Sequence, residues 1–430
     1  MNKKILYGPQ TKAAIENFPF SYPLAHLEFV MAMVEIKKAA AVANLKAGKL
    51  TSDRSKRIIF ACNEILKGRY NEQFVIKGLH GGAGTSVNMN VNEVVASLAG
   101  VHPNDDVNAS QSTNDVNPSA LKIASIKLTR QLLDGLLYLI KVFEKRAAEF
   151  KDIKKLGRTH MQDAVPTTLG AEFQSYTDIL KRDMKRIEEA EKYLFELNLG
   201  GTAIGNSINA SKNYIDNVYK ELRNNTKIKE LKPMKNLMSG TSSDTDFCHL
   251  SSSVNMLCLD MSKIATDLRF MTSGPRGGIG EISFIEMQQG SSIMPGKVNP
   301  IICETMNQIY FQVDGRNTTV HHAAENSHLE LGVMLPAIAD SLITMLKIVE
   351  AGLRLFADRG ISKIVVNEKR CLELLERSMA YGTLLTPRLG YDTVSKIVKE
   401  AVATGKTLRE IILDKKILSK TELNKLLVLK

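Results

Sequence analysis

Long stretches of the 430-residue chain place an apolar residue at every third or fourth position, with polar or charged residues between them. The clearest stretch is 167–198, where the opposite face carries Lys, Arg and Glu, as in an amphipathic helix. Residues 119–149 carry apolar positions on more than one stripe, which predicts a helix buried on several sides. Three further tracts predict long helices in the same way: 250–272, 301–322 and 337–357.

Proline placement supports these helices. Only 12 prolines interrupt the chain, and long proline-free tracts lie between them. Since a proline inside a helix costs about 3 kcal/mol, these tracts permit long helices. Alternating patterns typical of strands are scarce. We therefore predict an all-α protein built on a bundle of long helices.

The connections between the predicted helices are long and rich in Gly, Ser, Thr and Asn. Long polar loops on a rigid scaffold often carry binding groups. The same residue types also favour turns and helix caps, so any single loop can be purely structural. The loops lie at 78–92, 102–118, 157–168, 200–209, 240–246 and 290–300.

The charge favours small anionic ligands over nucleic acid. The chain has 57 Lys and Arg against 46 Asp and Glu, a net charge of +11. These basic residues are scattered over predicted polar helix faces rather than gathered in one stripe, so we expect no nucleic-acid partner. No run of apolar residues is long enough to predict a membrane span.

The five cysteines are odd in number and form no C-x-x-C motif. This spacing argues against a zinc site and a disulfide framework, and it is typical of the reducing cytoplasm. No cluster of metal ligands stands out. We expect no cofactor and no required metal, while activation by a metal at a separate site stays open.

The most distinctive segment is 290–300, with the sequence GSSIMPGKVNP. Its two glycines and two prolines exclude a regular helix. Ser291 and Ser292 follow a glycine, where backbone N–H groups can converge on an anion, while Lys297 adds a positive charge and Asn299 an amide. The segment fits a mobile loop with a serine base and a carboxylate anchor, or else a plain polar turn.

Three other polar clusters are candidate sites. His160 follows Thr159, and a carboxylate such as Glu304 would orient its ring and favour its charged form, although a lone His is more often structural. The glycine-rich run at 81–84 lacks the Lys-Ser/Thr ending of a phosphate-binding loop. Two sets of neutral donors instead suit a small carboxylate: Thr85 with Ser86, and Ser112 with Thr113 and Asn114.

Taken together, these segments resemble the aspartase/fumarase superfamily. Residues 290–300 match its signature loop almost letter for letter, and the other clusters follow in the family's order along nearly the whole chain. The resemblance implies five long central helices per subunit, which form a 20-helix core in a homotetramer, with each active site built from three subunits. It also implies three domains: an N-terminal helical domain at 1–111, a central long-helix bundle at 112–367 carrying the serine loop, and a small C-terminal helical domain at 368–430.

The chemistry that the resemblance implies is reversible anti elimination from a dicarboxylate to give fumarate. By motif, Ser291 is the base, Lys297 and Asn299 bind a carboxylate, and Thr159 and His160 hold the carboxylate that takes up charge. Glu304 orients His160. The remaining pocket residues are Thr85, Ser86, Ser112, Thr113 and Asn114.

The substrate follows from smaller differences. GGAGTS at 81–86 and STND at 112–115 resemble enzymes that release ammonia from L-aspartate, which is the activity we expect. The Gly200-Gly201 pair favours the alternative, a class II fumarase acting on L-malate, and a non-catalytic binding homologue is a remote third possibility. Three features depart from the family: a short connection between Glu93 and His102, Asn117 where an aromatic or small apolar residue is common, and Gly332 in place of Asn. We expect Gly332 to lie in a central helix and to cost about 1 kcal/mol there.

Overall fold

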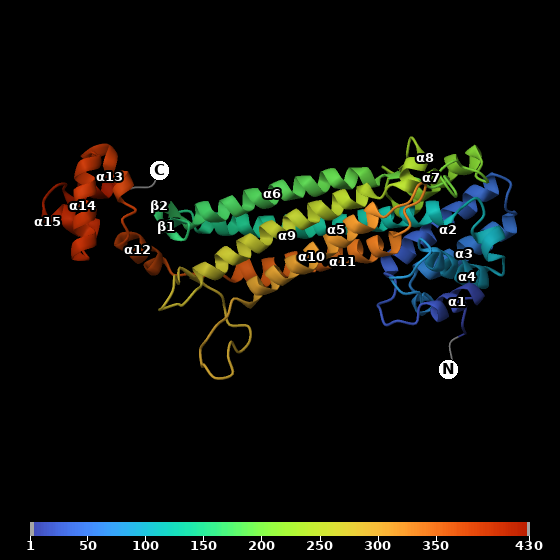
Figure 1. The fold of residues 1–430 in the computed structure, drawn as a ribbon, viewed down its shortest axis with the longest axis horizontal. Coiled ribbons are helices and arrows are strands. Elements are labelled where there is room, and N and C mark those ends of the chain that lie inside the picture. The colour runs from blue at the N-terminus through green and yellow to red at the C-terminus, as the bar shows by residue number, and fades with distance from the viewer. Residues whose placement is uncertain (1–3, 428–430) are drawn as a thin grey trace. The chain divides into compact units, whose positions relative to one another are not determined.

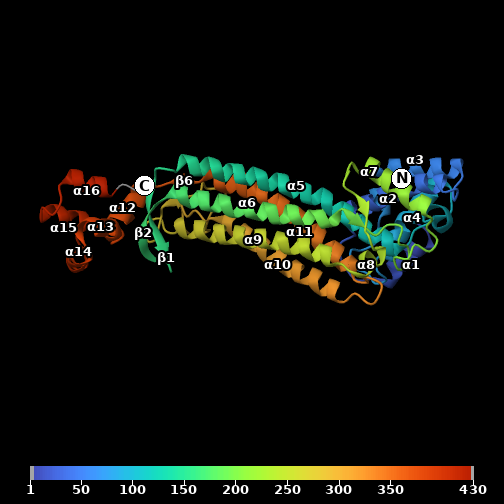
Figure 2. The ribbon, with the colours of Figure 1, turned by 90° about the horizontal axis from the view of Figure 1, so that it is seen from above.

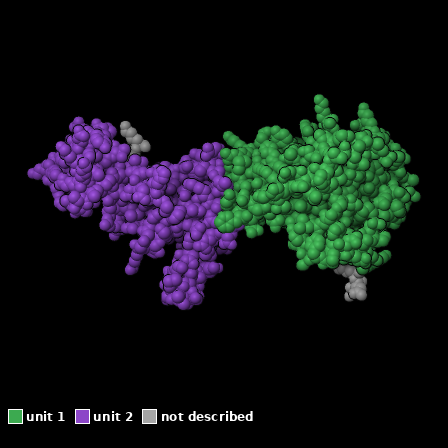
Figure 3. Space-filling view, in the orientation of Figure 1, with its two compact units in different colours: residues 1–134, 183–258, 309–351 green, residues 135–182, 259–308, 352–430 purple. Residues whose placement is uncertain are grey.

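The computed structural model describes residues 4–427, and its helices confirm the all-α prediction. Figures 1 and 2 show long helices throughout, with only short two-stranded sheets. The chain divides into two compact units, coloured in Figure 3. Unit 1 comprises residues 1–134, 183–258 and 309–351, and unit 2 comprises 135–182, 259–308 and 352–430. The three domains expected from the family remain a prediction.

All five predicted long helices form, and each contributes residues to both units. They lie side by side within each unit (Figures 1 and 2). Their bounds are α5 Thr113–Glu149, α6 Leu169–Leu194, α9 Thr245–Met271, α10 Ile301–Glu325 and α11 Leu335–Leu355.

Pro118 lies inside α5 as its sixth residue. A proline has no N–H, so the carbonyl of Asn114 loses its helical partner. The side-chain Nδ2 of Asn198 donates to that carbonyl at 3.0 Å. A side chain from the connection after α6 therefore repairs the first turns of α5.

In unit 1, α2 packs against both α3 and α7, and its buried positions run around most of the helix. The helices of this unit other than the long five are α1 Pro9–Asn17, α2 Leu27–Lys46, α3 Ser52–Leu66, α4 Thr85–Ala99, α7 Lys212–Thr226 and α8 Leu237–Ser242. Short 3-10 and π turns occupy Asn71–Gln73 and Pro103–Val107, and β3 (Glu196–Leu197) pairs in parallel with β4 (Lys232–Pro233).

The loop expected at 78–92 is wrong in its second half, because α4 begins at Thr85. Its three asparagines, Asn88, Asn90 and Asn92, are buried rather than solvated. Asn90 donates from Nδ2 to the carbonyl of Gln73 at 3.0 Å and accepts from the N–H of Val75 at 3.2 Å. Both partners belong to the segment before α4. They satisfy the amide of Asn90, so this residue can be buried inside a helix although asparagine is also common in loops.

In unit 2, the loop expected at 157–168 is instead an antiparallel hairpin of β1 (Lys154–Thr159) and β2 (Gln162–Thr168). The aromatic rings of Phe143, Phe173 and Phe356 pack in the core of this unit. The remaining elements are β5 Ile282–Ser283, β6 Val365–Val366, turns at Phe356–Gly360 and Ile361–Lys363, α12 Glu368–Arg377, α13 Gly382–Leu389, α14 Tyr391–Thr404, α15 Leu408–Asp414 and α16 Lys420–Leu426. A capping box between Thr407 and Glu410 begins α15.

Gly332 lies in the connection between α10 and α11, so the helix penalty expected for it is wrong. A Cβ atom at this position would lie 2.2 Å from Oδ2 of Asp244. Asp244 is buried, and this burial raises its pKa to about 6. Because Gly332 has no side chain, the carboxylate of Asp244 can occupy this space.

No helix within residues 4–427 is long and apolar enough to cross a membrane. All five cysteines are free, and four of them are buried. Burial raises the pKa of the Cys62 and Cys303 thiols to about 12, which keeps both protonated.

Candidate active site

The serine loop belongs to unit 2 and leaves the helices as an extended segment (Figure 1). Oγ of Ser291 accepts from the N–H groups of Ile293 at 3.2 Å and Met294 at 3.1 Å. Two donors on one oxygen favour its anionic form. Ser292 is exposed and has no hydrogen-bond partner among the described residues. The two adjacent serines thus differ in their surroundings, although the sequence could not separate them.

Asn299 closes the serine loop. Its Nδ2 donates to the carbonyl of Gly290 at 2.8 Å, which joins the two ends. A Cβ at Gly290 would lie only 1.9 Å from the carbonyl oxygen of Lys297, so only glycine permits this approach. Lys297 is exposed and has no ion-pair partner within residues 4–427. The same loop therefore carries an unpaired cation and the Ser291 hydroxyl.

Thr159 and His160 lie at the tip of the β1–β2 hairpin, and both are exposed. His160 and Met161 form the two-residue turn, with φ angles of 52° and 60°. Such left-handed angles belong to tight hairpin turns and are costly for residues other than Gly, Asn or Asp. The hairpin therefore holds His160 in a strained turn, as is common at functional sites.

A buried ion network fixes the base of this hairpin. Nη1 of Arg158 donates to Oε1 of Glu281 at 2.9 Å, and Nζ of Lys155 lies 3.2 Å from Oε2. Lys155 also donates to Glu172 of α6 at 2.8 Å. Glu281 is fully buried, and its neighbouring cations offset the cost of burying its charge.

Glu304 lies in the first turn of α10, also in unit 2. The described residues of this single chain include no hydrogen bond or ion pair between Glu304 and His160. The orienting role expected for Glu304 stays a prediction.

The remaining candidates belong to unit 1. An open pocket of about 560 Å³ is lined by residues that include Asn108, Ser112, Thr202 and Ala203. Nδ2 of Asn114 donates to the carbonyl of Ala203 at 2.8 Å, and Oγ1 of Thr113 accepts from Asn88 at 3.2 Å. The Ser112–Asn114 segment and the 200–209 connection therefore form one wall.

Thr85 and Ser86 open helix α4, where Oγ1 of Thr85 donates to the carbonyl of Gly82 at 2.8 Å. Asn117 supports this turn by donating from Nδ2 to the carbonyl of Ala83 at 3.1 Å. A Cβ at Gly84 would lie 2.2 Å from that Nδ2. Asn117 thus forms a hydrogen bond to the backbone just before Thr85, and the absence of a side chain at Gly84 leaves room for it.

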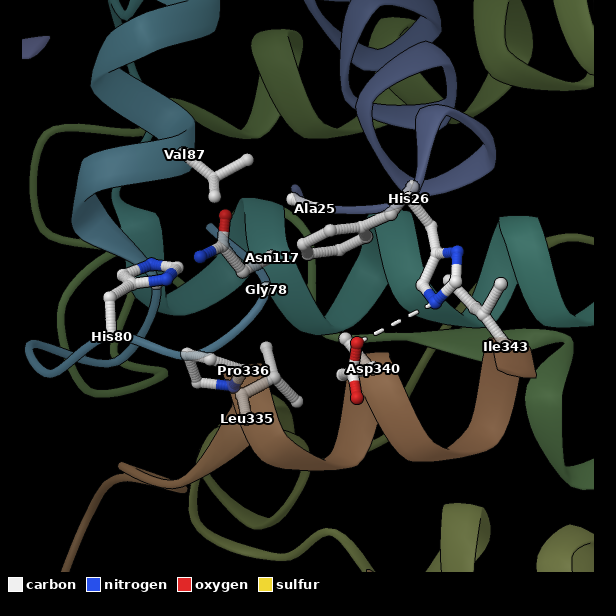
Figure 4. A pocket seen from close by; sticks show the side chains of 13 residues that line it. Ala25, His26, Gly78, His80, Val87, Asn117, Leu335, Pro336, Asp340 and Ile343 are labelled. Carbon is white, nitrogen blue, oxygen red and sulfur yellow. Dashed lines mark ion pairs between the residues drawn. The ribbon is translucent and has the colours of Figure 1, made fainter. Parts of the chain in front are cut away.

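A second, smaller pocket lies beside Asn117 and is shown in Figure 4. His80 and Asn117 lie on one side of it, and His26 with Asp340 on the other. Nε2 of His26 lies 3.7 Å from Oδ1 of Asp340, and Tyr22 donates to Oδ2 at 2.6 Å. Burial lowers the pKa of His26, which keeps its ring neutral.

The candidate residues therefore fall into two groups, one in each unit. Sequence reasoning quoted Asp115 within its polar cluster but assigned it no role, and it missed Asn198. Both lie beside the Ser112–Asn114 segment. The sequence signal for Asp115 was an acidic residue in the first turn of a predicted helix. The signal for Asn198 was only indirect, because Pro118 leaves a backbone carbonyl of the same helix without its usual partner. No group of three or more His, Cys, Asp or Glu side chains within residues 4–427 is arranged to hold a metal ion.

Comparisons with known proteins find relatives along nearly the whole chain. The family model described as Lyase matches residues 2–315, and the model described as Fumarase C C-terminus matches residues 383–430. The chain is 41% identical to an aspartate ammonia-lyase of Bacillus subtilis, covering 98% of this chain and 91% of that protein. It is 39% identical to an aspartate ammonia-lyase of Helicobacter pylori, covering 99% and 93%.

Two solved structures share the fold. A fumarate lyase:delta crystallin from Brucella melitensis bound to cobalt superposes with a TM-score of 0.96 at 40% identity, covering 99% of this chain and 95% of that one. A class II fumarase from Schistosoma mansoni superposes with a TM-score of 0.94 at 31% identity, covering 100% and 95%.

Proposed function

Since this chain belongs to the aspartase/fumarase superfamily of lyases, we propose that it is an aspartate ammonia-lyase, which converts L-aspartate to fumarate and ammonia. The observation that carries the proposal is that the chain is about 40% identical, over nearly its full length, to proteins named aspartate ammonia-lyase. The signature loop is intact in the chain, with Ser291, Lys297 and Asn299 in place. The short Glu93–His102 connection and Gly332 leave that loop unchanged.

Ser291 is the proposed base. It removes the proton from the carbon next to one substrate carboxylate, and charge then builds up on that carboxylate as an aci-carboxylate dianion. The two N–H groups that point at Oγ support this role, because they stabilise the serine anion before it takes the proton. Ammonia leaves from the neighbouring carbon.

The developing dianion needs aimed donors. Lys297 and the second N–H of Asn299 are the proposed donors from the serine loop, while Thr159 and His160 approach from the hairpin tip, with Glu304 orienting the ring. Thr85, Ser86 and Ser112–Asn114 complete the pocket around the other carboxylate and the leaving amine. His160 and Lys297 are exposed in the single chain, which supports a site in which the substrate and other subunits contact them.

We propose a homotetramer in which three subunits contribute to each site. Large apolar side chains are exposed on the long helices, including Leu259 and Phe270 of α9 and Phe311 of α10. Packing against other copies would bury them. Light scattering should then give four times the 47.6 kDa chain mass. We place the enzyme in the cytoplasm, in keeping with its free cysteines.

A fumarase activity is the second candidate, favoured by the similarity to the Schistosoma mansoni enzyme. The two functions separate in one experiment: purified protein is incubated with L-aspartate or with L-malate, and fumarate is followed by its ultraviolet absorbance. The proposal predicts fumarate from L-aspartate. Fumarate from L-malate alone would assign the fumarase activity instead, and no turnover of either, together with salt-sensitive DNA binding, would favour a non-catalytic homologue.

A further inference from the structure

Asp115, in the first turn of α5, joins two segments that are far apart in sequence. Its side chain is fully buried. Oδ1 accepts from the N–H of Ser112 at 2.9 Å, and Oδ2 accepts from the N–H groups of Gly200 and Thr202, both at 3.0 Å. One carboxylate therefore clamps the start of α5 to the 200–202 connection through three backbone donors.

Two of the clamped residues, Ser112 and Thr202, line the 560 Å³ pocket. On the pocket side of the clamp, Nδ2 of Asn114 donates to the carbonyl of Ala203 at 2.8 Å, so the two segments meet a second time. Oγ of Ser112 accepts from the N–H of Asn114 at 3.2 Å. A change in the clamp would shift these polar groups relative to one another, even though Asp115 does not line the pocket.

The charges around Asp115 are buried with it. Lys37 of α2 is fully buried and attracts the carboxylate, while its Nζ donates to Oδ1 of Asn108 at 2.8 Å and to Oε1 of Gln111 at 3.1 Å. Tyr214 and Tyr219 of α7 also face Asp115, and burial raises the pKa of each hydroxyl so that both stay neutral. Lys37 is thus the balancing charge, and it holds the 108–111 turn at the edge of the same pocket.

Burying two charges is an expensive way to stabilise a fold, because apolar residues of similar volume often do as well. A fixed arrangement of backbone donors is something that apolar residues cannot supply. We propose that Asp115 is a positioning residue: its carboxylate fixes the Ser112–Asn114 segment against the 200–203 connection, so that their polar groups meet one carboxylate of the substrate in a set geometry. This inference rests on the proposed function, since it requires a dicarboxylate in the pocket.

The test is Asp115→Asn in the full-length protein, with L-aspartate as substrate. The substitution keeps the size of the side chain but places an NH₂ group against backbone N–H donors. Since the carboxylate contact is made in both the ground state and the transition state, KM should rise by about 10- to 100-fold while kcat changes by less than about 3-fold. The matched control is Asp183→Asn, a fully buried aspartate of α6 paired with Arg186, which should leave KM unchanged.

Amide hydrogen exchange of wild-type protein keeps the test decisive if Asp115→Asn does not fold. The N–H groups of Gly200 and Thr202 should be protected at pH 8. Their protection should match that of the core amides of α5, because both N–H groups donate to the buried Asp115 carboxylate and exchange only when this contact opens. An unchanged KM in the folded variant, or rapid exchange of both N–H groups in wild-type protein, would overturn the positioning role. Absence of fumarate from wild-type protein would instead overturn the proposed function, and the exchange experiment would still report on the clamp.

Discussion

Nη1 of Arg158, in strand β1 of the hairpin that carries His160, donates to Oε1 of Glu281 at 2.9 Å. Glu281 also lies 3.2 Å from Nζ of Lys155, so two cations share one buried carboxylate. Removing one member of a buried ion network leaves the others uncompensated. Glu281→Ala should therefore lower the free energy of unfolding by about 3 kcal/mol or more in a urea titration.

An exposed ion pair supplies the control for this prediction. Asp53 pairs with Arg57 on the surface of α3, and Asp53→Ala should cost well under about 1 kcal/mol. Equal losses for the two variants would show that the Glu281 network does not hold the hairpin.

The pH dependence of stability should carry the signature of Asp115. Its pKa in the folded protein is about 6, above the usual 3.8, so the folded state binds this proton more tightly than the unfolded state. The contribution of Asp115 to stability is fully present below about pH 4 and is lost as the pH rises through 6. Lys37, whose pKa burial lowers to about 7, is mostly charged in both states below about pH 6 and adds little slope there, but it adds a slope of opposite sign as the pH approaches 7.

The measurement is the free energy of unfolding between pH 4 and pH 7 for wild-type protein and for Asp115→Asn. The wild-type curve should fall more steeply with rising pH than that of the variant. Parallel curves would mean that Asp115 is ionised throughout this range. Over the same pH range KM for L-aspartate should fall with rising pH, because the ionised carboxylate binds its three backbone N–H donors more tightly.

Mixed tetramers test the assembly of the site. Ser291→Ala inactivates the serine loop and Ser112→Ala the pocket wall of unit 1. If one site takes these segments from different subunits, unfolding and refolding the two variants together should restore part of the activity. A mixture of Ser291→Ala with Lys297→Ala should stay inactive, because both changes lie in the same loop. Equal failure of both mixtures would place the whole site within one chain.

The requirement for metal is a separate prediction. We expect that dialysis against EDTA leaves the rate of fumarate formation unchanged at a saturating concentration of L-aspartate. The related Brucella melitensis structure is bound to cobalt, so the experiment is informative for this fold. A loss of rate that Mg²⁺ or Co²⁺ restores would contradict the expectation.

The long helices could be predicted from the sequence because their apolar spacing is sustained over many turns, as in 167–198. The β1–β2 hairpin could not, because its strands are short and its turn is His160-Met161 rather than a glycine-containing pair. The start of α4 was also missed, since Asn90 is buried there by partners in another segment. Local pattern carries no information about such partners.

The candidate site shows the same division. The serine loop could be identified from its letters, but the difference between Ser291 and Ser292 depends on two N–H groups that only the folded loop places. The sequence predicts that Gly332 destabilises a helix, whereas the structure places it outside the helices with the Asp244 carboxylate beside it. Asp115 looked like one more polar residue, because its donors Gly200 and Thr202 lie more than 80 residues away.

The most direct test of the proposed function is the rate of fumarate formation from L-aspartate by wild-type protein, Ser291→Ala and Ser292→Ala. Ser292 is the matched control, since it is the adjacent serine and has no hydrogen-bond partner among the described residues. We predict that Ser291→Ala lowers kcat by at least about 100-fold, the scale of a lost general base, while Ser292→Ala retains most of it. A Ser291→Ala variant that keeps wild-type kcat would contradict the assignment of Ser291 as the base.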